Sequence, residues 1–307
     1  MLKLDELLVC PVCHTDLTFD LSGQASQGSC RVCGRRFLSQ NNVFDLTPVP
    51  PPDSDVAEMW HIWENLQNNG LVAYEQDPEH NLSVGKRQDV KAFAEFCNLS
   101  GLTLDIGCGP QSSIPSYANA ICDRYIGIDP LIGVQPRDFT FVKCIAEYLP
   151  FRPATFDHIL FATSLDHMLS PKRALQETKR LLKPNGTINI WFFDTTKRKR
   201  KGLLSIWKAR SRFAMTLLKQ GKTKEFVQRL VRRFPKPPRA IPNNDNIVQP
   251  NTPAYLADLS IPTGAIDHFH FFHPTQAEAQ QWLQEIGLKI VKTKIFNVNH
   301  VFVQAKI

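Results

Sequence analysis

Residues 102–110 read Leu-Thr-Leu-Asp-Ile-Gly-Cys-Gly-Pro, an apolar strand that runs directly into a glycine turn. Gly107 and Gly109 have no Cβ, so the backbone can turn sharply and bring its N–H groups close to a ligand before the next helix begins. The third glycine of a dinucleotide fingerprint is missing, because Gln111 and Ser112 stand where it would fall. The stretch therefore predicts a strand, a turn open to a ligand, and a helix.

A second apolar strand, Tyr125 to Asp129, ends in a carboxylate 24 residues after Asp105. A carboxylate in this place can bind both hydroxyls of a ribose. Further apolar strands, expected near 139–144, 156–162 and 187–193, alternate with helical segments. This alternation predicts a parallel, doubly wound α/β sheet.

Four further stretches occur in the order found in the class I S-adenosylmethionine-dependent methyltransferases, which the chain resembles: Ala146 to Phe151, Thr155 to Asp157, Leu165 to His167, and Glu177 to Gly186. The resemblance runs from Ser83 to Phe193 and again from Asp267 to Ile307. It implies a Rossmann-like, seven-stranded doubly wound sheet with a reversed last strand. Two apolar segments, 288–296 and 300–305, are joined by a tight connection and match that reversed strand.

The resemblance implies that S-adenosylmethionine binds beyond the carboxyl ends of the strands. Asp129 would hold the ribose, and Asp105 would position the amino group of the methionine part directly or through water. Family members commonly hold the adenine with an acid after the third strand. Ile145 stands there in this chain, which leaves the backbone of Ala146 as the expected contact. The expected cofactor residues are Asp105, Gly107, Cys108, Gly109, Asp129, Ala146 and Glu147.

The expected general base is His167, after the fourth strand. Histidine titrates near neutral pH, and this loop faces the methyl group in the family that the chain resembles. A base is needed only if the acceptor carries a proton that must leave. Asp166 would orient His167 or meet the substrate. In the alternative interpretation, His167 packs against or caps the following helix.

A histidine-rich segment precedes the last helix: residues 267–274 read Asp-His-Phe-His-Phe-Phe-His-Pro. Alternation in an extended segment places His268 and His270 on one side. We interpret this side as a polar wall of the acceptor pocket, with His270 as a third catalytic candidate. Three histidines also suggest a metal site as an alternative, but no carboxylate at a recognised ligand spacing supports it.

The N-terminal segment carries two CxxC pairs, and a gap of sixteen residues separates them. Four thiolates complete the closed tetrahedral shell of a structural Zn²⁺ site, so Cys10, Cys13, Cys30 and Cys33 are the expected metal ligands. Redox-active thiols are the alternative, but a lone redox pair would not need a second knuckle. His14, next to the first knuckle, is expected at the surface.

The four-cysteine segment resembles the small zinc-ribbon proteins that activate certain tRNA and protein methyltransferases. The resemblance implies a role in support or partner recognition, since a closed zinc site contributes folding energy rather than catalysis. The expected domains are a zinc ribbon at 1–47, a stiff proline-rich linker at 48–54 and a methyltransferase domain at 55–307. The linker would separate two units, each with its own core.

Early in the expected catalytic domain, apolar residues including Trp63 and Leu66 recur at helical spacing. We expect this stripe to pack on the sheet. Trp60 and Trp63 are alternatively lid residues over the cofactor.

The 307 residues, 43% of them apolar, suffice for a substantial core, and no apolar run approaches the ~20 residues of a membrane span. No export signal is recognised and a disulfide framework is not expected, so we expect a cytoplasmic protein, with peripheral contact to the inner face of a membrane as one option.

The positive charge of the chain is concentrated in one segment. Between Lys197 and Arg239 stand sixteen Lys and Arg and one acid, Glu225, while the whole chain carries only +7.

This basic, amphipathic insertion, about 197–262, suits an anionic membrane surface, a lipid-linked acceptor or RNA, or forms a solvated lid. The main functional hypothesis is O-methylation of a small molecule, sugar or lipid-linked glycan precursor. One alternative is an RNA methyltransferase that uses the ribbon and the insertion for RNA contact. The other is a zinc-ribbon scaffold with an inactive methyltransferase domain, against which the retained Asp105, Gly107, Gly109 and Asp129 argue.

Overall fold

The computed structural model describes residues 4–20, 27–40, 43–50, 56–76, 87–119, 124–197, 266–267 and 269–307. The basic insertion beyond Lys197, His268 and part of the proline-rich linker lie outside these ranges, so the predictions made for them stay predictions. Apart from Lys197, the described residues belong to one compact unit. Within them, no helix combines the length and apolar character needed to span a membrane.

Seven strands form the sheet of the catalytic domain, in the spatial order β7-β6-β5-β8-β9-β11-β10. The bounds are β5 Leu102–Ile106, β6 Arg124–Asp129, β7 Thr140–Lys143, β8 Phe156–Ala162, β9 Leu182–Phe193, β10 Lys289–Phe296 and β11 His300–Lys306. β5 to β9 pair in parallel, and β11 runs antiparallel to both of its neighbours. The expected Rossmann-like doubly wound sheet with a reversed last strand is confirmed.

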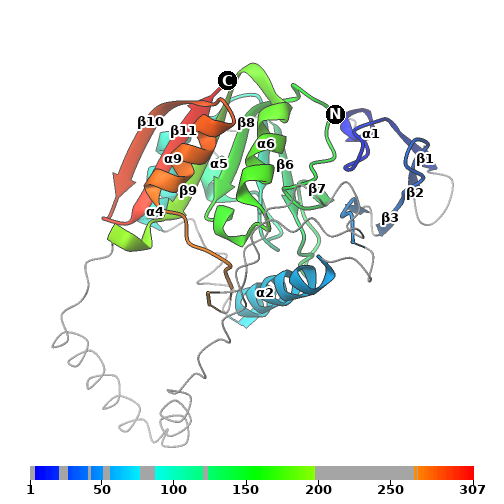
Figure 1. Ribbon diagram of the computed structural model, residues 1–307, viewed down its shortest axis with the longest axis horizontal. Helices are drawn as coiled ribbons and strands as arrows, with labels where there is room; N and C mark the ends of the chain where they lie inside the picture. Colours follow the sequence, from blue (N-terminus) through cyan, green and yellow to red (C-terminus); the bar gives the residue numbers. More distant parts are fainter. Residues whose placement is uncertain are drawn as a thin grey trace, which may run out of the picture. The chain divides into compact units, whose positions relative to one another are not determined.

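Helices cover both faces of the sheet (Figure 1). α4 (Gln88–Cys97) and α5 (Ser116–Asn119) lie over one face, and α6 (Pro171–Leu181) and α9 (Gln276–Glu285) over the other. Because both faces are covered, β5 is buried at all five positions, as is usual for a central parallel strand. α9 begins at a capping box, in which Thr275 and Glu278 satisfy each other's backbone N–H groups.

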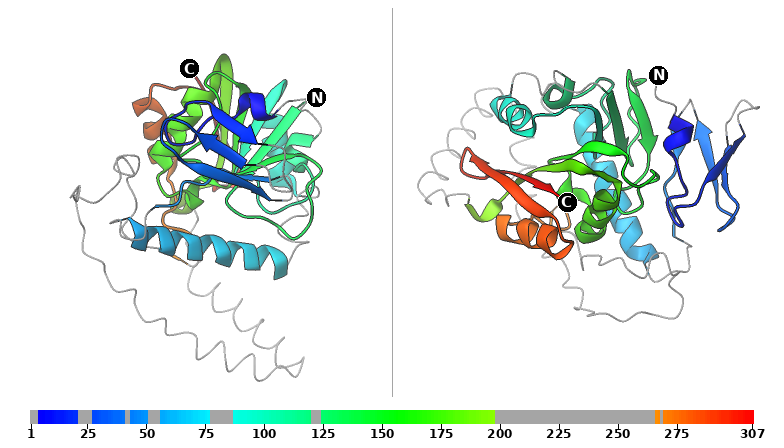
Figure 2. Two further views of the ribbon diagram at one scale, coloured as in Figure 1. Left: turned by 90° about the vertical axis from the view of Figure 1, so that its right-hand side faces the viewer. Right: turned by 90° about the horizontal axis from the view of Figure 1, so that it is seen from above.

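α2 (Ala57–Gln76) crosses the molecule near the carboxyl ends of the strands (Figures 1 and 2). Its apolar stripe includes Trp60, Trp63 and Leu66, which are all buried. These side chains pack with Ile145, after β7, and Phe271, before α9. The expected packing role of the stripe is therefore present, and it places α2 directly over the end of the sheet where a ligand would bind.

The N-terminal segment consists of α1 (Leu4–Leu7), β1 (Leu17–Asp20), β2 (Gln27–Cys30), β3 (Arg36–Gln40) and β4 (Val43–Asp45). Strands β1 to β4 continue the catalytic sheet beyond β7 (Figure 2), because β4 pairs in parallel with β7. An otherwise open sheet edge is thereby covered.

The N-terminal segment and the catalytic domain also share one hydrophobic core. Leu8 and Leu46 are almost fully buried in the same cluster as Phe151 of the catalytic domain. Lys143 Nζ lies 2.6 Å from an Asp45 carboxylate oxygen across the β4–β7 pair. The expected separation into two units with their own cores is corrected on this point: the strand that was assigned to the ribbon is bound into the catalytic sheet.

Candidate active site

The glycine turn after β5 is held by backbone hydrogen bonds. The N–H groups of Gly107 and Cys108 both donate to the carbonyl oxygen of Ile128, at 2.9 and 3.1 Å. Gly107 and Gly109 have φ angles of +76° and +78°, a conformation that side chains with a Cβ adopt only at a cost. A Cβ on Gly107 would come within 2.4 Å of the Ser164 Cβ, whereas one on Gly109 would meet nothing within 4 Å. The turn is packed on one side and open on the other.

Asp129, at the end of β6, fixes the open side of this turn. One carboxylate oxygen accepts from Gly109 N at 2.7 Å and the other from Leu131 N at 2.8 Å. Burial raises the pKa of Asp129, although these two hydrogen bonds oppose the shift. Since a carboxylate oxygen has two lone-pair sites, each oxygen retains capacity for a further donor such as a ribose hydroxyl.

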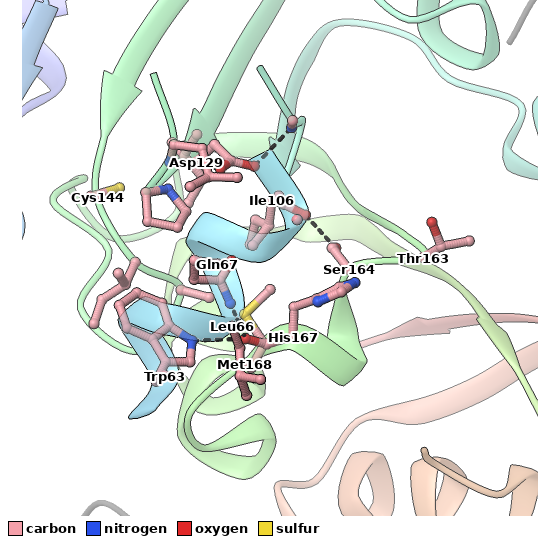
Figure 3. A pocket seen from close by; sticks show the side chains of 18 of the residues that line it. Trp63, Leu66, Gln67, Ile106, Asp129, Cys144, Thr163, Ser164, His167 and Met168 are labelled. Carbon is pink, nitrogen blue, oxygen red and sulfur yellow. Dashed lines mark hydrogen bonds between the residues drawn. The ribbon is translucent and has the colours of Figure 1, made fainter. Parts of the chain in front are cut away.

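A cavity of about 700 Å³, which is partly open to solvent, lies beside the turn. Figure 3 shows its lining from close by. The expected cofactor residues that line it are Gly107, Gly109, Asp129, Ala146 and Glu147. Cys108 lines a neighbouring cavity of about 810 Å³, together with the same two glycines. The residues therefore fit the S-adenosylmethionine that the sequence implies, with open turn backbone beside a carboxylate at the end of the next strand.

Asp105 lies behind the turn and lines neither cavity. It is fully buried, and one of its oxygens accepts hydrogen bonds from the hydroxyls of Tyr117 at 2.7 Å and Tyr125 at 2.6 Å. Burial raises the pKa of Asp105 to about 6, against the effect of the two tyrosines. Through its hydrogen bond with the Tyr117 hydroxyl, Asp105 orients Tyr117, which lines the neighbouring cavity. The other oxygen of Asp105, Oδ1, has no hydrogen-bond partner among the described residues, and its expected role at the methionine part stays a prediction.

Glu147 is a buried carboxyl group at the wall of the cavity that Asp129 and Ala146 also line. Its Oε1 accepts from Ser170 N, at the start of α6, at 2.9 Å, while Oε2 has no hydrogen-bond partner within the described part of the chain. Burial raises the pKa of Glu147 to about 7. A buried carboxyl oxygen left free beside a cavity is available to a polar ligand.

Two residues of α2 line the site: Trp63, which the lid alternative placed over the cofactor, and Gln67, which was not expected there. Trp63 Nε1 and Gln67 Nε2 both donate to the carbonyl oxygen of His167, at 2.9 and 3.1 Å, and both line the cavity (Figure 3). The sequence signal that could have indicated Gln67 was its position, as an uncharged polar residue one turn after Trp63. The helix thus packs on the sheet, as expected, and also fixes the turn that carries His167.

His167 and Asp166 lie on the short 3₁₀ helix η2 (Leu165–His167) after β8. His167 lines the cavity, and its Nδ1 lies 3.2 Å from the carbonyl oxygen of Phe269. Because a carbonyl only accepts, Nδ1 carries the proton, and Nε2 of the neutral ring is left as a base or a metal ligand. His270 lies beside it, with ring centroids 4.4 Å apart. The structure therefore brings the three expected catalytic residues, His167, Asp166 and His270, into one cluster.

Two further residues complete this cluster, which we call the His/Asp cluster: Asp166, His167, Asp267, His270 and His273. Asp267 accepts from His270 Nδ1 at 2.8 Å and His273 Nε2 at 3.2 Å. The other nitrogens of these rings face Asp166 Oδ2, at 3.7 Å for His270 Nε2 and 3.8 Å for His273 Nδ1. Burial lowers the pKa of His270, whereas the negative charge of the nearby Asp166 raises the pKa of His273.

The four N-terminal cysteines also converge. Their Sγ atoms all lie within 4.8 Å of one another, with 3.6 Å between Cys10 and Cys33 and 3.4 Å between Cys13 and Cys30. The four thiols and their spacing fit the tetrahedral site expected for a structural Zn²⁺. His14 stands outside this set: its Nε2 lies 3.3 Å from a Glu177 carboxylate oxygen on α6 and so links the ribbon to the catalytic domain.

Comparisons with known proteins agree with this geometry. Residues 104–190 match the family model described as a methyltransferase domain. The chain is 28% identical over 163 residues to the O-methyltransferase resE of Aspergillus sclerotiorum, which covers 46% of this chain and 62% of the relative. It is 30% identical over 92 residues to a demethylmenaquinone methyltransferase of Paenarthrobacter aurescens, covering 28% of this chain and 36% of that enzyme. The chain thus spans less than two thirds of the length of either relative.

Among solved structures, an N1-methyltransferase of Burkholderia thailandensis, bound to 1,6-didemethyltoxoflavin and S-adenosylhomocysteine, is similar with a TM-score of 0.48. The two chains share 12% sequence identity, over 94% of this chain and 97% of that one. Residues 104–190 thus match a methyltransferase domain, and they lie in a sheet with the Rossmann-like strand order and a reversed last strand.

Proposed function

We propose that the protein is an S-adenosylmethionine-dependent O-methyltransferase whose acceptor is a small molecule, a sugar or a lipid-linked glycan precursor. The observation that carries this proposal is the position of His167, which lines the cofactor cavity with Nδ1 engaged by Phe269 O. The bare Nε2 suits an acceptor hydroxyl, which must lose a proton as it gains a methyl group. The similarity to a fungal O-methyltransferase supports the same acceptor atom.

In this proposal the protein binds the cofactor, orients the acceptor hydroxyl and removes its proton. Asp129 holds the ribose, the backbone of Ala146 and the free oxygen of Glu147 face the adenine, and the open side of Gly109 admits the methionine part. The bound cofactor supplies a methyl group on a sulfonium for in-line displacement. The protein's main contribution is then to hold the acceptor hydroxyl at near-attack distance and to take its proton.

The N-terminal segment has a supporting role in this proposal. β4 covers the edge strand β7, whose end leads into the cavity wall at Cys144 and Ile145. Zn²⁺ at the four cysteines would hold the knuckles that position this strand, as a closed structural site does. Such support resembles the role of the zinc-ribbon activators, here within one chain.

Methyl transfer from labelled S-adenosylmethionine to a panel of phenols, sugars and lipid-linked glycans tests the function. We expect a labelled methyl ether, and we expect His167→Asn to lower kcat while binding of S-adenosylhomocysteine persists. A matched control is His61→Ala, because the His61 side chain on α2 is 73% exposed and lies outside the cluster. Methylation of nitrogen or RNA by the wild-type protein would contradict the O-methyl assignment. Absence of cofactor binding by folded, zinc-loaded protein would favour the scaffold alternative.

A further inference from the structure

We propose that the His/Asp cluster is a second metal site, which binds one first-row divalent transition-metal ion beside the cofactor cavity. Asp166, His167 and His270 each offer one ligand atom, and these atoms all lie within 4.8 Å of one another. Two imidazoles and one carboxylate form the donor set of the facial-triad sites that bind such ions and leave coordination positions open. The nitrogen donors disfavour Mg²⁺ and Ca²⁺, which take oxygen ligands.

The distances around Asp166 fit a coordination shell better than a hydrogen-bonded network. Asp166 Oδ2 lies 3.7 Å from His270 Nε2 and 3.8 Å from His273 Nδ1. Both are too long for hydrogen bonds. Two donors each bonded to a metal at about 2.0–2.1 Å stand about 2.9 Å apart at right angles and about 3.4 Å apart at tetrahedral angles. Asp166 and His270 would therefore have to approach by less than about 1 Å, and the ligand atom of His167 lies within 4.8 Å of both.

Burial supplies the second, independent observation. Asp166 is only 4% exposed, yet its Oδ1 has no hydrogen-bond partner among the residues that the structure describes. His273 Nδ1 is likewise buried without a partner in that part of the chain. A carboxylate removed from water is costly unless it is paired, hydrogen-bonded or bound to a metal. A cation between these groups would meet that requirement.

The outer hydrogen bonds orient the rings for metal binding. Asp267 accepts from His270 Nδ1 and is itself held by the backbone N–H groups of Phe269 and His270, at 2.8 and 2.9 Å. The protonated Nδ1 leaves Nε2 of His270, which lies 3.7 Å from Asp166 Oδ2, free to bind a metal, and the contact with the carbonyl of Phe269 likewise leaves Nε2 of His167 free. Such carboxylate–histidine and carbonyl–histidine pairs are the usual outer shell of metal-bound imidazoles.

Through the proposed function, on which this one step rests, the ion would bind the acceptor oxygen. The ion would lower the pKa of the bound hydroxyl, as it does for metal-bound water, and the proton would pass to solvent water. His167 would then be a ligand of the ion, whereas in metal-free protein its Nε2 stays free as the base of the proposed function. The metal binding itself stands without this step and is tested without acceptor or cofactor.

Titration of metal-free protein with Co²⁺ separates the two sites by their spectra. We expect two equivalents to bind: one with intense thiolate-to-cobalt charge-transfer bands from the four cysteines, and one with only weak d–d bands from nitrogen and oxygen ligands. Asp166→Asn and His270→Ala should each remove the second equivalent and keep the first. Cys10→Ser should remove the first, and the His61→Ala control should bind two.

The retained thiolate bands and binding of S-adenosylhomocysteine report that each cluster variant is folded. If wild-type protein binds one equivalent only, or if both cluster variants still bind two, the proposal is wrong. A second equivalent that binds no more tightly in wild type than in Asp166→Asn would equally overturn it. None of these measurements requires methyl transfer, so failure of the proposed function is recorded separately.

Discussion

Replacing Gly107 and Gly109 by alanine, one at a time, should separate stability from cofactor binding. Both glycines have a positive φ, +76° and +78°, so alanine in either place incurs a backbone strain of about 1–2 kcal/mol. In Gly107→Ala the new methyl group would also stand 2.4 Å from the Ser164 Cβ. Overpacking of this kind costs about 1–3 kcal/mol more. The free energy of unfolding should therefore fall by about 2–5 kcal/mol for Gly107→Ala and about 1–2 kcal/mol for Gly109→Ala.

Gly109→Ala should be the less destabilised of the two variants, but it should bind the cofactor more weakly than the wild-type protein does. Its missing Cβ faces open space at the cavity, with nothing within 4 Å, and a methyl group there would occupy the room that we assign to the cofactor. Calorimetry with S-adenosylhomocysteine should show affinity for Gly109→Ala at least about tenfold weaker, which is about 1.4 kcal/mol. Urea unfolding, monitored by circular dichroism, measures stability on the same samples.

A double variant provides the control. Ser164→Gly removes the atoms that a Cβ on Gly107 would meet, so Gly107→Ala combined with Ser164→Gly should be more stable than the sum of the single effects. Equal stabilities for the two glycine variants would refute the packing argument. Unchanged cofactor affinity in Gly109→Ala would refute the placement of the methionine part.

Three further predictions follow from other parts of the molecule. Cys10→Ser should lower the zinc content by one ion per chain and also lower the unfolding midpoint of the catalytic domain, since Cys10 lies in the shared core; metal analysis and thermal unfolding measure the two effects. The pKa of Glu147 is raised to about 7, so its neutral form stabilises the fold at low pH, and this contribution is lost as the pH rises from about 4.5 towards 7. Glu147→Gln should therefore lose less stability than the wild-type protein across this range. Unfolding free energies that change in parallel with pH for the two proteins would contradict the raised pKa. Neutralising Lys197 to Lys201 should reduce binding to anionic vesicles more than binding to RNA; a steep, salt-dependent loss of RNA binding alone would favour the RNA alternative, and binding to neither would favour a lid.

The strands, the glycine turn and the cysteine knuckles could be predicted from the sequence, because each depends on residues that are neighbours in the chain. An apolar run followed by Gly107 and Gly109 specifies its own turn, and a CxxC pair brings two thiols together within one knuckle. The position of Asp129 at the end of the second strand could also be predicted from the sequence. Its place at the cavity follows from the parallel pairing of β5 with β6.

Tertiary structure decided what surrounds these local units. Asp105 bonds to Tyr117 and Tyr125 rather than lining the cavity, because the side of a central strand on which a carboxylate lies depends on the elements packed there. The joining of β4 to β7 likewise depends on contacts about a hundred residues apart, between Asp45 and Lys143. No spacing rule reports such pairs.

The His/Asp cluster shows the difference most clearly. In the sequence, three histidines stand near a carboxylate, Asp267, whose spacing is not that of a known metal motif. The folded chain adds Asp166 and His167 from the end of β8, a hundred residues earlier, and turns Asp267 into the partner that orients His270 and His273. The sequence by itself determined which side chains are available and which short segments carry them. The packing of η2 against the segment before α9 decided that five of these side chains meet, because only the folded chain brings distant segments within bonding distance.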